Sequence, residues 1–217
     1  MRGPDPRHLG EPQVLIGGLI LPHPPVILPA YAGSRDGEVE ETISAVRNAC
    51  AWLAELRPER LLIASPHVGH GFDVPLHFLG EALGRELRVE RVLTDDPAYD
   101  TYQKRGEQLS RLEAGERRRT AVIASGDCSH MLSPDGPYGF DASGPLLDDA
   151  IQAGLRAGRA DDLLSIERSL VEAGGECGLR AFVFALAALR PERVEILSYQ
   201  APFGVGYLVA RLHAREE

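Results

Sequence analysis

The chain has 217 residues, of which 44% are hydrophobic and 25% charged, a composition that excludes a wholly disordered protein. Its formal net charge of −9 argues against nonspecific binding to nucleic acid or to an anionic membrane. Three cysteines without a Cys-x-x-Cys pair fit a reducing compartment better than a disulfide framework. We expect one domain over residues 1–217, located in the cytoplasm, with residues 1–13 as a flexible N-terminal tail.

Three short aliphatic runs predict strands that are buried on both faces of a sheet. They cover residues 14–20, 60–65 and 120–125. The first run is too short to cross a bilayer, so we expect no association with a membrane. Each run ends in a turn signal that leads to a histidine, and these histidines are His23, His67 and His130.

Helical patterns follow the strands in chain order. Apolar residues spaced three and four apart predict an amphipathic helix over residues 39–56, which Pro58 stops. Further helices are predicted at residues 97–114, from about Pro145 onward, and at residues 160–172 and 176–189, the last of them buried. Two C-terminal strands follow at residues 194–199 and 206–213, whereas residues 68–96 show no decisive pattern.

Strands that alternate with helices predict a layered α/β domain with a largely parallel sheet. In such sheets, ligands bind beyond the carboxyl ends of the strands. Loops leaving those ends carry the three histidines, so the imidazoles converge if the three strands are parallel neighbours. The strand order itself is not given by the sequence.

His23 and His67 have no acidic neighbour in the sequence, and they have the character of metal ligands. Neutral imidazole is the commonest metal ligand in proteins, and two imidazoles with one carboxylate form the facial triad of non-haem Fe(II) oxygenases. The natural carboxylate is Glu176, which follows two glycines at the start of an apolar helix. A helix dipole also stabilises an acid at that place, and the residues alone favour neither interpretation of Glu176.

Six short motifs follow one another along the chain: LPHPP (21–25), SPH (65–67), SGDCSH (125–130), GPYGFD (136–141), ECGLR (176–180) and YQAPFGVGY (199–207). Together they resemble the class III extradiol ring-cleavage dioxygenases of the LigB type, and in particular the branch of small prokaryotic proteins linked to Memo-like proteins. The resemblance spans nearly the whole chain.

The resemblance implies a single three-layer α/β/α domain with a mixed, mostly parallel sheet and an Fe(II) site. It implies that His23, His67 and Glu176 hold the metal, that His130 is the catalytic acid/base, and that Asp127 supports it. An imidazole suits proton exchange with a diol near neutral pH. The implied substrates are a small aromatic diol and O₂.

The sequence departs from the family pattern at several points. The segment between His67 and Gly126 is shorter than is usual in the family, which leaves open whether it forms an active pocket. His70 and His77 are not part of the motifs; we favour His67 as the ligand and His70 as a surface or supporting residue. Cys177 adjoins Glu176 and stays an alternative ligand, since a thiolate favours a softer ion such as Cu(I) or Zn²⁺.

These observations lead to one principal functional hypothesis and two alternatives. The principal one is a non-haem Fe(II)-dependent extradiol dioxygenase that inserts O₂ into a catecholic ring. The first alternative is a Memo-like metal-binding protein without turnover, which acts through partners, and the second is a Zn²⁺-dependent hydrolase. The substrate, the native metal (iron, zinc or copper) and the oligomeric state, including a homo-oligomer, stay open.

Overall fold

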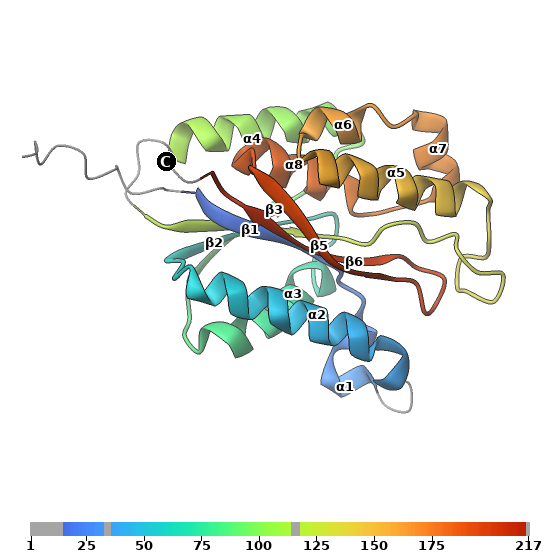
Figure 1. Ribbon diagram of the computed structural model, residues 1–217, viewed down its shortest axis with the longest axis horizontal. Coiled ribbons are helices and arrows are strands. Elements are labelled where there is room, and N and C mark those ends of the chain that lie inside the picture. Colours follow the sequence, from blue (N-terminus) through green and yellow to red (C-terminus); the bar gives the residue numbers. More distant parts are fainter. Residues whose placement is uncertain (1–14, 33–35, 114–117, 216–217) are drawn as a thin grey trace, which may run out of the picture.

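The computed structural model describes residues 15–32, 36–113 and 118–215, so the tail expected at residues 1–13 lies outside the described residues. Within them, six strands form one sheet in the order β3-β2-β4-β1-β6-β5 (Figure 1). Their bounds are β1 Leu15–Leu21, β2 Arg60–Ser65, β3 Arg88–Leu93, β4 Thr120–Ser125, β5 Arg193–Gln200 and β6 Tyr207–His213.

The sheet is mixed, with a parallel part and an antiparallel edge. Strands β3, β2, β4 and β1 are parallel neighbours. Strand β6 then pairs antiparallel with β1, and β5 pairs antiparallel with β6. The α/β fold class is thereby confirmed, and the three strands that precede the histidines of the motifs are adjacent and parallel.

Helices cover both faces of the sheet (Figure 1). One face carries the short helices η1 (Pro25–Ile27) and α1 (Pro29–Ala32) together with α2 (Asp36–Glu55) and α3 (His70–Leu83). The other face carries α4 Tyr99–Glu113, α5 Ser143–Ala157, α6 Ala160–Leu164, α7 Arg168–Gly174 and α8 Leu179–Leu189. The result is the three-layer α/β/α arrangement.

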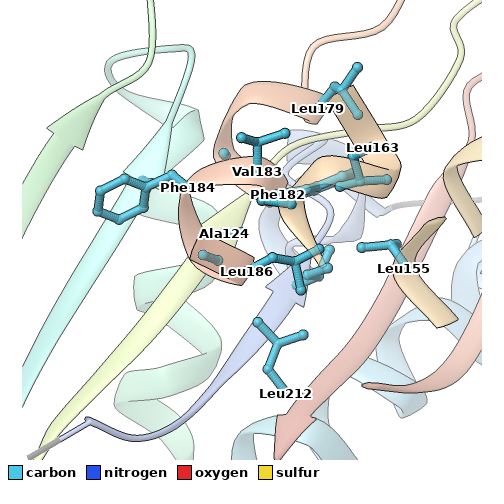
Figure 2. Close-up of a cluster of buried hydrophobic side chains, with 14 of the residues drawn as sticks. Ala124, Leu155, Leu163, Leu179, Phe182, Val183, Phe184, Leu186 and Leu212 are labelled. Atoms are coloured by element: carbon cyan, nitrogen blue, oxygen red, sulfur yellow. The ribbon is translucent and has the colours of Figure 1, made fainter. Parts of the chain in front are cut away.

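Each face of the sheet has its own apolar core, because successive side chains of a strand point to opposite faces. In β2, Leu61 and Ile63 pack toward α2 and α3, whereas Leu62 and Ala64 pack toward the helices of the opposite layer. Helix α8 is buried along its whole length and contributes the centre of that second core (Figure 2). This burial anchors the segment just before α8, where Glu176 and Cys177 lie.

The structure changes two predicted helices and assigns one segment that the sequence left undecided. The helix predicted over residues 160–172 is interrupted, because α6 ends at Leu164 and α7 begins only at Arg168. The undecided segment 68–96 contains α3 and β3, and α3 accommodates Pro75 in its second turn. The helix predicted from residue 176 begins at Leu179, which leaves Glu176 and Cys177 in a loop.

Among the helices of the described residues, none combines the length and the apolar composition that crossing a lipid bilayer requires.

Candidate metal centre

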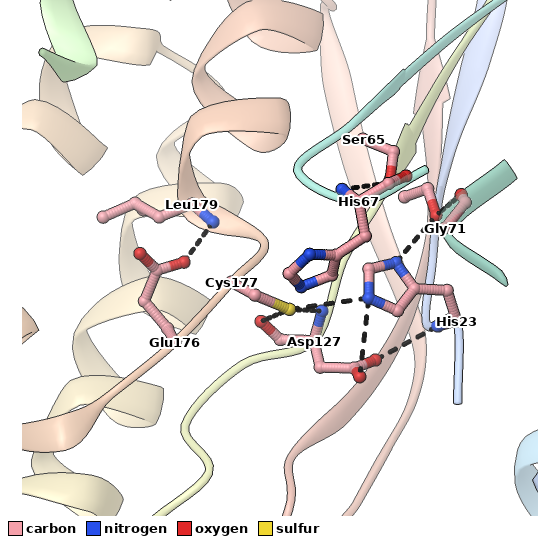
Figure 3. Close-up of polar contacts among 9 residues, drawn as sticks. His23, Ser65, His67, Gly71, Asp127, Glu176, Cys177 and Leu179 are labelled. Carbon is pink, nitrogen blue, oxygen red and sulfur yellow. Dashed lines mark hydrogen bonds and ion pairs between the residues drawn. The ribbon is translucent and has the colours of Figure 1, made fainter. Parts of the chain in front are cut away.

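The carboxyl ends of β1, β2 and β4 lie at one edge of the sheet and carry three of the predicted site residues. His23 comes two residues after β1, His67 two after β2, and Asp127 two after β4. The parallel register pairs Leu21 with Ser125, so the loops that carry His23 and Asp127 start level with each other. The rings of His23 and His67 lie 5.4 Å apart between centroids, and Figure 3 shows both beside Asp127. The loops after these strands therefore converge, and two of the three imidazoles expected to meet, those of His23 and His67, lie close together.

His23 is buried and held by hydrogen bonds to its backbone and to its ring. Its amide N–H donates to Asp127 Oδ1 at 3.1 Å, and its Nδ1 lies 3.0 Å from Ser125 Oγ. Ser125 Oγ donates its own proton to the Gly71 carbonyl at 2.6 Å, so it can only accept a proton from His23 Nδ1. The ring is therefore the Nδ1–H tautomer, and its Nε2 lone pair is free to bind a metal ion.

The Gly71 carbonyl at the end of this chain of hydrogen bonds has no partner within its own helix, because a proline stands four residues later. In a regular helix, the N–H of residue 75 would bond to the carbonyl of residue 71. Pro75 has no N–H, so the Gly71 carbonyl in the first turn of α3 accepts the Ser125 hydroxyl instead. The proline inside α3 thus contributes to fixing the orientation of His23.

Both imidazoles are neutral at physiological pH, as metal ligation requires. Burial, followed by the neighbouring His70, His67 and His130, lowers the pKa of His23 to about 3. Burial, followed by His70 and Arg180, also lowers the pKa of His67 below its usual value. His67 is more exposed than His23, and its backbone N–H donates to Ser65 Oγ at 3.3 Å. Neither ring needs to lose a proton before it binds an ion.

Cys177 completes a group of ligand atoms with these two histidines. Its Sγ lies 3.6 Å from His23 Nε2 and accepts the backbone N–H of Asp127 at 3.3 Å. One ligand atom from each of His23, His67 and Cys177 lies within 4.8 Å of the other two. Burial raises the pKa of the Cys177 thiol well above its usual value, so it is a neutral thiol until a cation replaces its proton.

Glu176 is placed differently from the sequence-based expectation that it is the carboxylate ligand. Its carboxylate accepts the Tyr99 hydroxyl at 2.8 Å and the Leu179 N–H at 2.5 Å, and Figure 3 shows it pointing away from His23 and His67. The first N–H groups of a helix have no partner within the helix, and the Glu176 carboxylate satisfies one of them at the start of α8. The side chains of Glu176 and Cys177 point in different directions, so Cys177 rather than Glu176 faces the histidines.

Asp127 was expected to support His130, but it also lies buried against His23. Its Oδ2 lies 3.9 Å from His23 Nε2. Burial raises its pKa to about 7, an effect that the hydrogen bond from the His23 amide partly offsets. Its carboxylate also forms a second close group with His130 and Cys177, in which the ligand atoms again lie within 4.8 Å of one another. Asp127 is therefore an oxygen donor within reach of the same site.

His130 lies at the edge of this site with one ring nitrogen unused. Its ring stacks on Tyr138, with 4.9 Å between centroids and 28° between planes. Its Nε2 is buried and has no hydrogen-bond partner within the described part of the chain. Burial, followed by His67, lowers its pKa, so the ring is neutral and this nitrogen can accept a proton.

The two additional histidines of the sequence differ from each other. His70 is exposed, yet its ring lies 5.2 Å from that of His23 and 5.4 Å from that of His67. His77 points elsewhere on α3, where its Nε2 lies 3.2 Å from Glu81 Oε1. The structure therefore brings His70 to the site and leaves His77 outside it.

A transition-metal ion fits these donors, because an imidazole nitrogen, a second imidazole and a thiol gather with a buried carboxylate beside them. Among the described residues, the close group of ligand atoms contains His23, His67 and Cys177, whereas the expected ligand Glu176 lies outside it and binds the Leu179 N–H. Nitrogen and sulfur donors suit iron, copper and zinc rather than magnesium or calcium. The orphaned Nε2 of His130 adds a base beside the same donors.

Sequence reasoning missed the residues that orient the site rather than form it. Ser125 lies inside the SGDCSH motif, and its place directly before Gly126 and Asp127 was a usable signal. Tyr99, which binds Glu176, and Gly71, which anchors Ser125, come from the segment near α3 and α4 that carried no motif. Their roles follow only from the three-dimensional arrangement.

Comparison with known proteins places the chain in a family. The model of the catalytic LigB subunit of aromatic ring-opening dioxygenase matches residues 67–210. The chain belongs to this family. A curated relative, Protein CA_C1420 of Clostridium acetobutylicum, is 24% identical over 275 residues. The match covers 92% of this chain but 58% of that protein, so the chain spans little more than half the length of this relative.

Proposed function

We propose that this LigB-family chain is a metal-dependent oxidoreductase that opens a catecholic ring with O₂. The observation that carries the proposal is the convergence of neutral His23 and His67 imidazoles with the Cys177 thiol at the edge of the sheet. The family model that matches the chain describes the catalytic subunit of an aromatic ring-opening dioxygenase, and this description supports the choice of reaction.

The ion belongs at His23, His67 and Cys177, with the buried Asp127 carboxyl beside it and not among its ligands. A thiolate carries the same single negative charge as the carboxylate of a facial triad, so a divalent ion keeps a net positive charge that favours an anionic diol. When bound, Fe²⁺ or copper would supply the one-electron chemistry that O₂ requires, which zinc lacks. We retain Fe²⁺ as the proposed ion, and copper as the ion that the thiol favours.

His130 is the base for the diol in this proposal. Its Nε2 is buried, unpaired and neutral, so it can accept the proton of a substrate hydroxyl. Stacking on Tyr138 fixes the plane of the ring and thereby the direction in which Nε2 points. The same stacking leaves the exposed Tyr138 beside the site, where an aromatic substrate would meet an aromatic surface.

One observation favours a second candidate, a Memo-like metal-binding protein without ring-opening turnover. The thiol of Cys177 stands where the family resemblance implied a carboxylate, and thiolate ligands select copper and zinc over Fe²⁺. Such a protein would bind its ion tightly and act through a partner rather than through turnover.

Two neighbouring substitutions test the ligand set. The protein is purified without O₂, stripped of metal and titrated with Fe²⁺, Cu⁺ and Zn²⁺. Cys177→Ser removes the proposed sulfur ligand and should lower the affinity at least roughly tenfold, whereas Glu176→Gln retains an acceptor oxygen for Leu179 and should bind as the wild type does. The reverse pattern would restore Glu176 as the ligand and refute this assignment.

An oxygen electrode then tests the reaction on the metal-loaded protein with a panel of catechols. We expect O₂ uptake and a coloured ring-opened product with the wild type. His130→Ala should keep the metal and lower turnover by about 10²–10⁴-fold, the usual contribution of a general base. Loss of metal from His130→Ala would make His130 a ligand instead. Iron-loaded protein without O₂ uptake over the whole panel would refute the dioxygenase and leave the second candidate, and turnover that persists without O₂ would indicate a hydrolase.

A further inference from the structure

Three histidine rings, rather than two, surround the proposed metal position. The ring centroids of His23, His67 and His70 form a nearly equilateral triangle with sides of 5.4, 5.2 and 5.4 Å. The family motifs account for His23 and His67 but not for His70, which comes from the first residue of α3.

The size of this triangle matches that of imidazoles around one ion. A metal–nitrogen distance of 2.0–2.1 Å places each ring centroid roughly 3.2 Å from the ion. Two such rings at a tetrahedral angle are then about 5.2 Å apart between centroids. All three measured separations agree with this value to within a few tenths of an ångström.

We propose that His70 supplies a third imidazole to the ion held by His23, His67 and Cys177, completing a tetrahedral set of three nitrogens and one sulfur. This inference rests on the proposed metal centre. It makes the resting site a closed one, so a substrate or an added ligand must displace a protein ligand to reach the ion.

The backbone on both sides of His70 is built for this position. Gly69 has a φ of +65°, a left-handed conformation that glycine adopts without strain, and it turns the chain sharply between His67 and α3. A Cβ at Gly71 would lie only 2.2 Å from Ser65 Oγ, so glycine allows the start of α3 to approach the end of β2. The two glycines therefore bring His70 back toward His67.

The backbone beside His70 is also tied directly to His23. The carbonyl of Gly71 accepts the hydroxyl of Ser125, which in turn binds Nδ1 of His23. The segment that carries His70 and the ring of His23 therefore keep a fixed separation. His70 differs from His23 in that only its backbone is fixed, since its side chain is exposed.

A rotation of one side-chain bond is enough to turn the His70 ring toward the ion. Among the described residues, the close group of ligand atoms includes His23, His67 and Cys177 but no nitrogen of His70. A half-turn about the Cβ–Cγ bond of a histidine exchanges ring nitrogens with ring carbons and leaves the centroid in place. The triangle of centroids is therefore the same before and after His70 presents a nitrogen.

Cobalt titration of the metal-free full chain tests the third imidazole without any need for activity. Co²⁺ bound by three nitrogens and a thiolate in a tetrahedron gives strong visible absorption together with a sulfur charge-transfer band. His70→Ala should bind Co²⁺ on the order of tenfold more weakly and lose much of the visible absorption while keeping the sulfur band. His77→Ala is the matched control, because His77 lies on the same helix and pairs with Glu81.

Free imidazole provides a second measurement. Added at millimolar concentration, it should restore the tetrahedral spectrum of His70→Ala and leave His77→Ala unchanged. His70→Gln, a second variant that retains a polar side chain, should behave as His70→Ala does. Loss of Co²⁺ binding in His23→Ala but unchanged affinity and spectrum in His70→Ala would overturn the third imidazole and leave the proposed site intact. A wild type that takes up no Co²⁺ would overturn both.

Discussion

Substituting Gly126 tests whether close contact between two backbone segments positions the ligands of the proposed metal centre. Gly126 follows β4, and its N–H donates to the Leu21 carbonyl at 3.0 Å. A Cβ added at Gly126 would lie 2.2 Å from the Cα of Gly178 and 3.0 Å from its nitrogen. Gly178 directly follows Cys177, and its N–H donates to the Asp127 carbonyl at 2.9 Å. The contact of the two glycines therefore holds the thiol against the loop after β4.

The size of the effect follows from these distances. Nonbonded carbon atoms settle at about 3.5–4.0 Å, so Gly126→Ala must separate the two segments by roughly 1.3 Å. Overpacking of this kind typically costs about 1–3 kcal/mol, and we expect the upper end because the contacted atoms are backbone and cannot rotate away. A shift near 1 Å also exceeds the tolerance of about 0.2 Å in metal–ligand distances, so metal affinity should fall on the order of a hundredfold.

Urea unfolding followed by circular dichroism, together with calorimetric metal titration, measures both effects. Gly80→Ala is the control, because a Cβ at Gly80 in α3 meets nothing within 4 Å. Its replacement of a helical glycine should stabilise the protein by about 0.5–1 kcal/mol and leave metal binding unchanged. The reasoning is refuted if Gly126→Ala unfolds within about 0.5 kcal/mol of the wild type and binds metal equally well.

Two further predictions concern buried polar groups near the site. Ser125→Ala removes the acceptor that fixes the tautomer of His23, so metal affinity should fall about 10–100-fold in the same titration, and unchanged affinity would contradict the role of Ser125. Asp148, which accepts the Tyr199 hydroxyl and the Ser129 N–H, has its pKa raised from 3.8 to about 6, chiefly by burial. The folded state then binds more protons than the unfolded state between about pH 4 and 6, so the wild type loses stability as the pH rises through that window. Asp148→Asn has no carboxyl to titrate and does not lose stability in this way. Its free energy of unfolding relative to the wild type should therefore rise by up to about 3 kcal/mol from pH 4 to 7. A difference that does not change with pH would contradict the raised pKa of Asp148.

The sheet was largely predictable because its central strands are buried on both faces. Continuous aliphatic runs at residues 60–65 and 120–125 predicted β2 and β4 with the bounds that the structure shows. The first strand differs from its prediction by one residue at each end. A strand that is aliphatic on both faces must be covered on both faces, so the run of apolar residues is enough to predict a central strand. Their parallel adjacency, which the sequence left open, is what brings the loops of the site together.

Helix boundaries were less predictable because tertiary contacts decide them. Residues 68–96 showed no decisive pattern, and the Gly71 carbonyl that Pro75 leaves without a partner in α3 is satisfied by Ser125 at the end of β4, 54 residues away in sequence. The helix predicted over residues 160–172 is interrupted before Arg168, although neither glycine nor proline marks the break. For α3, the deciding hydrogen bond involves a residue that the local pattern does not contain.

The choice between Glu176 and Cys177 shows why the candidate site could be located but not completed from the sequence. Both residues adjoin the helix start, and a carboxylate is the commoner companion of two histidines in non-haem iron sites. Which of the two faces the histidines depends on the direction of the loop before α8. The helix requires an acceptor for the Leu179 N–H, and the Glu176 carboxylate can reach it and the Tyr99 hydroxyl together. A thiol is a weak acceptor and would serve that place poorly, whereas the buried Cys177 thiol can lie against the buried His23 ring. The hydrogen-bond needs of a buried helix end thus favour a sulfur ligand in the proposed centre.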